Sequence, residues 1–280
     1  MTGAVAATAA SSAEIFRAAR AGGRAALFEH EVYAVLQAAG FDVPRHVFWN
    51  GAPGLVPTEI GDFLEGLRGD DVVLKIVSPD LAHKSDVGGL SFSKKSPASV
   101  IAAARTMWED VSRRAPAAPR LGILVVEKLV PVSGTPAAEA LLSFKHDPAF
   151  GPVLVFGLGG VLTEWYGALA SGASTAILRP GSVKQDLEAV IEKHPALKIF
   201  FERNRGQAKA PLVLDEVAVR LENLSRNLLS YSPDNSLGNP TLEELEVNPL
   251  LLTTDGRWVA ADGKARLSSR RITPSSRPLR

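Results

Sequence analysis

The sequence predicts an α+β protein built from two lobes. Helical and strand patterns alternate irregularly along the 280 residues, and the last two strand patterns read as an antiparallel pair. Irregular alternation is typical of α+β folds, whereas a doubly wound parallel sheet is built from regular strand–helix repeats. We expect the two lobes to meet near residues 126–132.

The first half of the chain contains clear start and stop signals. Apolar residues recur at helical spacing from Leu27 to Ala39, and Gly40 ends the pattern. Ser96 and Pro97 suit the N-cap and the first position of another helix. We expect helices at residues 26–39, at 58–68 and from 97 onward, and strands at 44–49, 72–77, 90–93 and 122–130.

The second half contains a similar mixture of elements. We expect strands at residues 138–145, 152–156, 161–166, 174–178, 242–253 and 257–262, and helices at 182–193 and 212–230. The predicted division is a flexible N-terminal tail at 1–24, an N-terminal lobe at 25–128, a C-terminal lobe at 129–268 and a basic tail at 269–280. The Ala- and Ser-rich tail at 1–24 leaves open a targeting role.

Composition excludes several kinds of site and partner. The chain has no cysteine, so disulfides, thiol catalysis and thiolate-bound metals are excluded within it. The net charge of +1 argues against a general affinity for nucleic acid or acidic membranes. No apolar run is long enough for a membrane span. These features favour a cytoplasmic protein that acts on neither nucleic acid nor a membrane.

The first candidate site is a lysine in an apolar strand followed by a polar loop. Lys75 lies inside the run Val72–Val77, and the loop contains His83, Lys84, Ser85, Gly88 and Gly89. A lysine is costly to bury unless it meets an anion, and glycines let backbone N–H groups approach a phosphate. The pattern is equally that of a snorkelling lysine before an ordinary hairpin loop, and it matches neither a Walker A motif nor GxGxxG.

The second candidate is a glycine-rich stretch after an apolar strand. Phe156 is followed by Gly157, Gly159 and Gly160, with Glu164 shortly after. Glycines at the end of a strand permit close approach of the backbone to a ligand or to another strand. A simple bend in the chain explains the pattern equally well.

The third candidate consists of oxygen ligands on the last two strands. Alternation puts Glu246 and Asn248 on one face of a strand, and Asp262 follows 14 residues after Asn248. Carboxylate and amide oxygens suit Mg²⁺ rather than zinc, with phosphate oxygens completing the shell. Solvated carboxylates at a sheet edge are the alternative.

The turn between these strands decides whether Asp262 can join Asn248. A two-residue turn at Asp255 and Gly256 places Asp262 opposite Pro249. A three-residue loop that starts at Thr254, with Gly256 in the left-handed region, places Asp262 directly opposite Asn248. A shared metal therefore predicts the three-residue loop.

Three sequence blocks resemble one known family. Residues 73–89 resemble the signature of the β subunits of ADP-forming acetyl-CoA synthetases, and residues 150–160 and 244–250 resemble two further blocks of that family. This resemblance extends over residues 27–267. The chain also resembles, more distantly, the β subunits of succinyl-CoA synthetases. It implies an ATP-grasp fold, in which two lobes enclose a nucleotide cleft.

The resemblance also implies roles for single residues. Lys75 corresponds to the phosphate-binding lysine, and Glu127 and Glu139 to residues that hold adenosine. Asn248 and Asp262 reproduce the spacing of the family's Mg²⁺ ligands. His83 is implied either as a second phosphoryl relay or as a residue that fixes the loop.

The family's chemistry requires a second polypeptide. The resemblance implies phosphoryl exchange between ATP or ADP and a histidine of an α subunit, which also binds CoA, in an α₂β₂ assembly. Two alternatives stay open, a self-sufficient ATP-grasp carboxylate ligase and a non-catalytic nucleotide-sensing subunit. Departures from the family pattern at Ser143 and at residues 167–168 and 173–179 keep the second alternative open.

Overall fold

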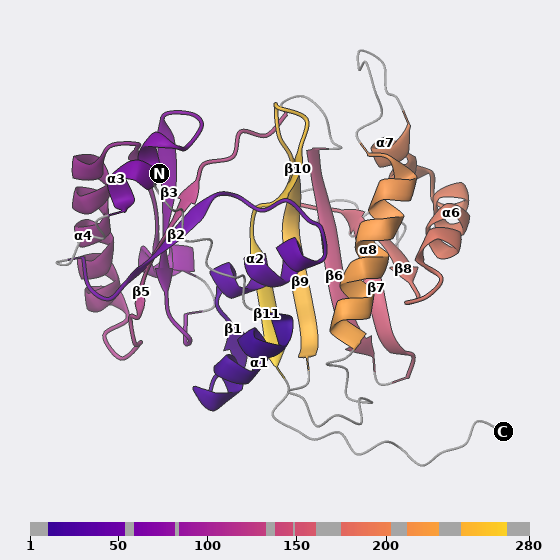
Figure 1. Cartoon of the computed structure of the whole chain (residues 1–280), viewed down its shortest axis with the longest axis horizontal. Coiled ribbons are helices and arrows are strands. Elements are labelled where there is room, and N and C mark those ends of the chain that lie inside the picture. The colour runs from indigo at the N-terminus through magenta and orange to yellow at the C-terminus, as the bar shows by residue number, and fades with distance from the viewer. Residues whose placement is uncertain are drawn as a thin grey trace, which may run out of the picture. The chain divides into compact units, whose positions relative to one another are not determined.

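The structure is a computed structural model, shown in Figure 1. The expected strand at 161–166 and the basic tail at 269–280 lie outside the described residues, as do His83 and Glu164. The structure describes residues 11–53, 59–81, 84–132, 138–147, 149–160, 175–202, 212–229 and 242–267.

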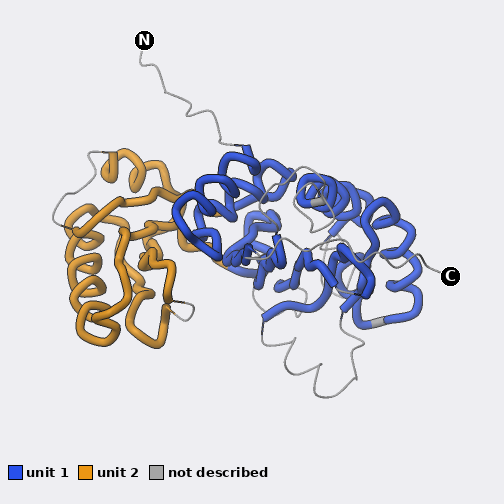
Figure 2. The backbone as a smooth tube through the Cα atoms, turned by 90° about the horizontal axis from the view of Figure 1, so that it is seen from below, with its two compact units in different colours: residues 1–43, 131–280 blue, residues 44–130 orange. Residues whose placement is uncertain are grey.

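The chain divides into two compact units, coloured separately in Figure 2. Unit 1 comprises residues 1–43 and 131–280, and unit 2 comprises residues 44–130. The predicted N-terminal lobe was therefore wrong for residues 25–43, which belong to unit 1. The physical reason is strand pairing, because Ala26 and Leu27 pair with Arg266 and Ala265 near the other end of the chain.

Unit 2 is a four-stranded antiparallel sheet with helices packed on one face. Side chains from alternate positions of its strands, such as Val72, Leu74 and Ile76, form a core with Val100 and Met107 of the long helix. Its elements are β2 (His46–Asn50), α3 (Ile60–Glu65), β3 (Asp71–Val77), the short 3₁₀ helix η1 (Lys84–Val87), β4 (Leu90–Lys94), α4 (Pro97–Arg114) and β5 (Gly122–Glu127), and the strand order is β2-β5-β3-β4.

Unit 1 is built on a seven-stranded sheet whose paired strands are antiparallel. The strand order is β1-β11-β9-β6-β7-β8, and β10 pairs with β9. The strands are β1 (Ala26–Leu27), β6 (Glu139–Asp147), β7 (Gly151–Leu158), β8 (Thr175–Leu178), β9 (Leu242–Leu252), β10 (Trp258–Ala260) and β11 (Gly263–Leu267).

Helices of unit 1 cover one face of its sheet. Helices α2 and α8 lie in front of the strands in Figure 1, and α2, α6 and α8 pack against β11, β8 and β7. The helices are α1 (Ser12–Ala21), α2 (Glu29–Ala38), α6 (Val183–Lys193), α7 (Lys198–Phe201) and α8 (Leu214–Leu229), with the 3₁₀ helix η3 (Pro195–Leu197). The predicted mixture of helices and antiparallel strands is confirmed.

Two further details correct the sequence-based boundaries. The predicted flexible tail contains helix α1, which begins at a capping box formed by Ser11 and Glu14 and buries Phe16 and Ala19 completely. The predicted strand at 257–262 is interrupted, because residues 261 and 262 belong to neither β10 nor β11. Across the described part of the chain, no helix is both long and apolar enough to cross a membrane.

Candidate functional site

Lys75 lies in the middle of β3 on the face opposite the helices of unit 2. Its neighbours Leu74 and Ile76 point into the core under α4, so alternation directs Lys75 to the other side. It is half-buried and is paired across the sheet with Leu90 and Leu124. The Lys75 side chain therefore lies on the face of this sheet opposite α4.

The loop after β3 folds back on itself. The Gly88 N–H donates to the Ser85 carbonyl at 3.1 Å, and the Gly89 N–H donates to the Lys84 carbonyl at 2.7 Å. Gly88 has a φ of +74°, and a Cβ on Gly89 would lie 2.4 Å from Cγ2 of Ile76. These glycines thus serve turn geometry and packing, and their N–H groups are used inside the loop rather than aimed at a phosphate.

Glu127, at the end of β5, is buried and tied to the backbone. Its side chain accepts a hydrogen bond from the Arg45 N–H at 3.2 Å, and its own N–H donates to the Arg45 carbonyl. The register pairs it with Val72, on the other face of the sheet from Lys75. These contacts explain Glu127 as a residue that fixes the end of β5, and its contact with a nucleotide stays a prediction.

The hairpin between β9 and β10 contains the three-residue loop. Thr253 pairs with Arg257 through a backbone hydrogen bond of 2.9 Å, and Gly256 has a φ of +80°. The same register continues into β11, where Val247 pairs with Gly263. Asn248 therefore faces Asp262, and the Asn248 N–H donates to the Asp262 carbonyl at 3.3 Å. The turn geometry that a shared metal requires is confirmed.

A β-bulge lies at Asn248. Ala140 of β6 pairs with Leu250 of β9, whereas Leu142 pairs with Val247, so Asn248 and Pro249 together oppose the single residue Leu141. A bulge bends its strand and redirects side chains, and bulges are frequent beside active sites.

Gly160 joins two of the predicted site residues. Its N–H donates to Oδ1 of Asn248 at 3.0 Å, and a Cβ at this position would lie 1.5 Å from Oε2 of Glu139. Gly159 donates its N–H to the Glu139 carbonyl, and a Cβ there would meet the Ala140 backbone at 2.4 Å. The glycine-rich stretch therefore brings Glu139 and Asn248 together, which is more than a simple bend requires.

The paired oxygens fit a magnesium ion that also binds phosphate. The Oδ1 atom of Asn248 has two lone pairs, and the Gly160 N–H uses one of them. Asp262 supplies a carboxylate on the opposite strand. Mg²⁺ is commonly held by one or two protein oxygens, with water and substrate phosphates as its remaining ligands. Within the described residues no cluster of three or more His, Asp or Glu side chains could hold a metal by itself.

The other predicted metal ligand, Glu246, lies further along β9 and has different cross-strand neighbours. It lies two residues before Asn248, about 7 Å further along the strand, and it is paired with Lys264 and Ser143 across the sheet. A lysine opposite this carboxylate offers an alternative to a metal, and the metal role of Glu246 stays a prediction.

Sequence reasoning missed a buried polar pair behind Asp262. Tyr33 and Glu29 are buried on helix α2, and the Tyr33 hydroxyl lies 3.0 Å from the Ala261 carbonyl. Burial raises the pKa of Tyr33 well above its usual value, and the negative charges of Glu29 and Asp262 raise it further. Nothing in the sequence connects Tyr33 with a segment 228 residues away.

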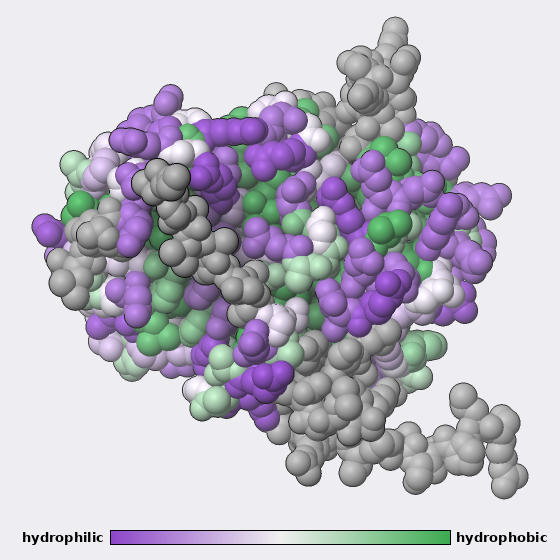
Figure 3. All heavy atoms as spheres, viewed as in Figure 1, coloured by the Kyte–Doolittle hydropathy of each residue, from purple (hydrophilic) through white to green (hydrophobic). Residues whose placement is uncertain are grey.

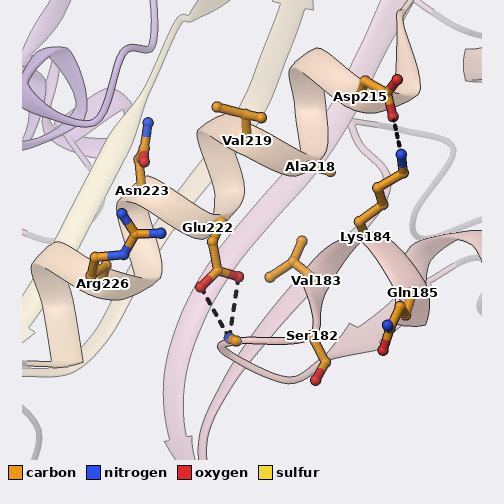
Figure 4. A pocket seen from close by; sticks show the side chains of 11 residues that line it. Ser182, Val183, Lys184, Gln185, Asp215, Ala218, Val219, Glu222, Asn223 and Arg226 are labelled. Atoms are coloured by element: carbon orange, nitrogen blue, oxygen red, sulfur yellow. Dashed lines mark hydrogen bonds and ion pairs between the residues drawn. The ribbon is translucent and has the colours of Figure 1, made fainter.

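Unit 1 also contains a pocket of about 560 Å³ between α6 and α8, shown in Figure 4. Three of its charged side chains have partners, since Lys184 contacts Asp215 at 2.8 Å and Glu222 accepts the Gly181 N–H at 3.1 Å. The hydrogen bond to Asp215 raises the pKa of Lys184, which keeps it charged. On the face drawn in Figure 3, hydrophobic side chains over α6 and α8 are separated by hydrophilic ones. None of the predicted site residues lines this pocket.

Comparison with known proteins places these features in a family. The model of the family described as "ATP-grasp domain" matches residues 18–267. The chain is 28% identical over 259 residues to the β subunit of acetate–CoA ligase [ADP-forming] I of Pyrococcus furiosus, covering 91% of this chain and 97% of the relative.

Two solved structures have the same fold. Both are of the dinucleotide forming acetyl-coenzyme A synthetase 1 of Ca. Korarchaeum cryptofilum. One contains coenzyme A, Ca-AMPCP and HgCl⁺, and it matches at 28% identity with a TM-score of 0.72, covering 92% of this chain and 100% of that chain. The other contains coenzyme A and Mg-AMPPCP, with a phosphohistidine segment pointing towards the nucleotide binding site. It matches at 26% identity with a TM-score of 0.66 and the same coverage. The predicted ATP-grasp fold is thereby confirmed, and the chain belongs to the ATP-grasp domain family.

Proposed function

We propose that this chain is the nucleotide-binding β subunit of an ADP-forming acyl-CoA synthetase. It would exchange a phosphoryl group between ATP or ADP and a phosphohistidine on an α subunit that also binds CoA. The observation that carries the proposal is the register that sets Asn248 opposite Asp262, with the Gly160 N–H fixing the Asn248 side chain. The likeness to a β subunit of this enzyme class over nearly its whole length supports the same conclusion.

The residues of unit 1 would hold the metal and the nucleotide. Asn248 and Asp262 would bind Mg²⁺, which when bound neutralises charge on the phosphate oxygens. The Gly160 N–H and the bulge at Asn248 keep the amide oxygen in one orientation. Glu139, whose carboxylate lies against Gly160, would accept a hydrogen bond from the nucleotide.

The residues of unit 2 would supply positive charge. Lys75 lies on the face of its sheet opposite α4 and would offset charge on the transferring phosphoryl group, which is the main service a protein gives this reaction. Lys84 and Ser85 would add donors from the loop. His83 keeps the two roles that the family resemblance implies, a relay or a loop-fixing residue, and the relay is our proposal.

The assembly is part of the proposal. Acyl selection and CoA binding would lie on the α subunit, and an α₂β₂ assembly follows from the family resemblance. We also propose a cytoplasmic location, because the substrates of such an enzyme are charged metabolites.

Binding of Mg-ADP is expected to stabilise the chain against heat. A ligand present at about 100 times its Kd stabilises the folded state by about 2.7 kcal/mol, which raises the melting temperature by several degrees. The measurement is a thermal shift with Mg-ADP, with ADP in EDTA and with Mg²⁺ alone. A shift that requires both components supports the proposal, whereas no shift with Mg-ADP or Mg-ATP contradicts it.

A further inference from the structure

Helix α2 contacts the segment that carries Asp262. The Tyr33 hydroxyl is within hydrogen-bond distance of the Ala261 carbonyl at 3.0 Å, although the two residues are 228 positions apart in sequence. Ala261 directly precedes Asp262. Helix α2 thereby reaches the residue directly before the proposed metal ligand.

The contact is made by a pair of buried polar side chains. Glu29 is 5% exposed and Tyr33 is fully buried, and the Tyr33 hydroxyl lies 2.5 Å from Oε1 of Glu29. Burying a carboxyl group is costly unless it is hydrogen-bonded, and the Tyr33 hydroxyl is a hydrogen-bond partner of Glu29. The single hydrogen of the Tyr33 hydroxyl has two acceptors within reach, Oε1 of Glu29 at 2.5 Å and the Ala261 carbonyl at 3.0 Å.

The segment at Asp262 needs such support. Residues 261 and 262 lie between β10 and β11, outside the regular ladder. The Ala261 N–H donates to the Pro249 carbonyl at 3.0 Å, while the Ala261 carbonyl is reached by Tyr33. The Ala261 N–H is therefore anchored to β9, and the Ala261 carbonyl lies within hydrogen-bond distance of the Tyr33 hydroxyl of α2.

The same helix also packs behind the residue that follows Asp262. A Cβ on Gly263 would lie 2.7 Å from Cγ1 of Val32, which is too close for an ordinary contact. Only glycine lets the backbone approach α2 this closely. Helix α2 thus contacts the chain on both sides of Asp262, through Tyr33 at residue 261 and through Val32 at residue 263.

We propose that Tyr33 and Glu29 are positioning residues that hold Asp262 opposite Asn248, so that the two side chains share one Mg²⁺ bound to the nucleotide. This inference rests on the proposed function. Groups that orient metal ligands set metal affinity without touching the metal, and their loss costs about 10- to 100-fold in affinity. A purely structural role for the pair would fix α2 to the sheet and leave metal affinity unchanged.

The first test removes only the hydroxyl group. Tyr33→Phe is expected to weaken Mg²⁺ binding about 10-fold or more, measured by calorimetric titration of Mg²⁺ at fixed ADP, while ADP binding in EDTA stays at the wild-type level. The matched control is Val35→Ala, which disturbs the packing of the same helix at a buried apolar side chain. It is expected to lower thermal stability without changing Mg²⁺ affinity.

The second test introduces a steric clash between residue 263 and helix α2 and then relieves it. Gly263→Ala places a methyl group against Val32 and is expected to weaken Mg²⁺ binding about 10-fold. Val32→Ala removes the clashing methyl group, so the double variant is expected to recover most of the lost affinity. Recovery of Mg²⁺ affinity in the double variant supports a role of α2 in setting the position of Asp262. Affinity that stays low in the double variant overturns that role.

The outcomes separate this inference from the proposed function. Wild-type Mg²⁺ affinity in Tyr33→Phe, or an equal loss in Val35→Ala, overturns the positioning role while the proposed function stands. A wild-type chain that binds ADP without any dependence on Mg²⁺ overturns both.

Discussion

Replacing Asn248 and Asp262 together with alanine is expected to abolish the thermal shift that Mg-ADP produces. The register places these two side chains opposite each other on β9 and on the segment before β11. With both oxygens removed, Mg²⁺ keeps only phosphate and water ligands, and the chain loses its selective affinity for the metal complex. At about 100 times Kd the lost stabilisation is about 2.7 kcal/mol.

The control for this variant uses the same two strands. Glu244 and Arg266 form an exposed cross-strand pair, with an ion-pair distance of 3.4 Å. An exposed pair of this kind contributes about 0–1 kcal/mol, so Glu244→Ala with Arg266→Ala should leave the fold and the Mg-ADP shift nearly unchanged. A full shift in the Asn248 and Asp262 double variant removes the metal assignment, as does an equal loss in the control.

Replacing Gly160 with alanine is expected to reduce Mg-ADP affinity about 10-fold or more. The added methyl group would occupy the position of the Glu139 carboxylate, at 1.5 Å from Oε2. Glu139 must swing away, and the backbone N–H that holds Asn248 shifts with it. The loss therefore affects both the proposed nucleotide contact and the orientation of a proposed metal ligand.

A second glycine separates this effect from backbone strain. Gly160 and Gly151 both have positive φ, +59° and +75°, but a Cβ on Gly151 would meet nothing within 4 Å. Alanine in the left-handed region costs about 1–2 kcal/mol at either position. Urea unfolding should thus show this cost of backbone strain in both variants, while calorimetry should show weaker Mg-ADP binding only for Gly160→Ala. Wild-type affinity in Gly160→Ala would exclude a role for this contact.

Local patterns in the sequence predicted most of the fold. The β9–β10 hairpin was predicted with two possible turns, and the structure has the three-residue one, in which Thr253 pairs with Arg257 and Gly256 has a positive φ. Helix α4 begins at its predicted N-cap, Ser96, because Ser and Pro have strong positional preferences at a helix start. Such features depend on neighbouring residues and can be read from them.

Contacts between distant segments could not be predicted in this way. Residues 26 and 27 looked like the first turn of a helix, yet they pair with β11, some 240 residues later. The short helix α1 was predicted to be a tail because the first 24 residues are rich in Ala and Ser, although Phe16 is fully buried. Tyr33 gave no signal at all, since its partner Ala261 is identified only by the folded chain.

The same limit applies to the candidate site. The glycines at 88 and 89 were expected to approach a phosphate, and their N–H groups are instead used within the loop. Spacing alone could not distinguish these two uses of glycine, because both require a residue without a side chain. For Gly160 the sequence did not distinguish a bend from a site residue. The structure shows a direct hydrogen bond from Gly160 to Asn248 and a close approach to Glu139.

We infer that this chain is the nucleotide half of a two-part acyl-CoA synthetase. It is tested most directly by mixing the purified chain with an α subunit of this enzyme class and measuring ATP formed from acetyl-CoA, phosphate and Mg-ADP. We expect ATP to form only when both chains are present, with a phosphohistidine on the α subunit detected by mass spectrometry. Equal ATP-dependent ligation by this chain alone, or no phosphoryl exchange with the phosphorylated α subunit, would contradict the account.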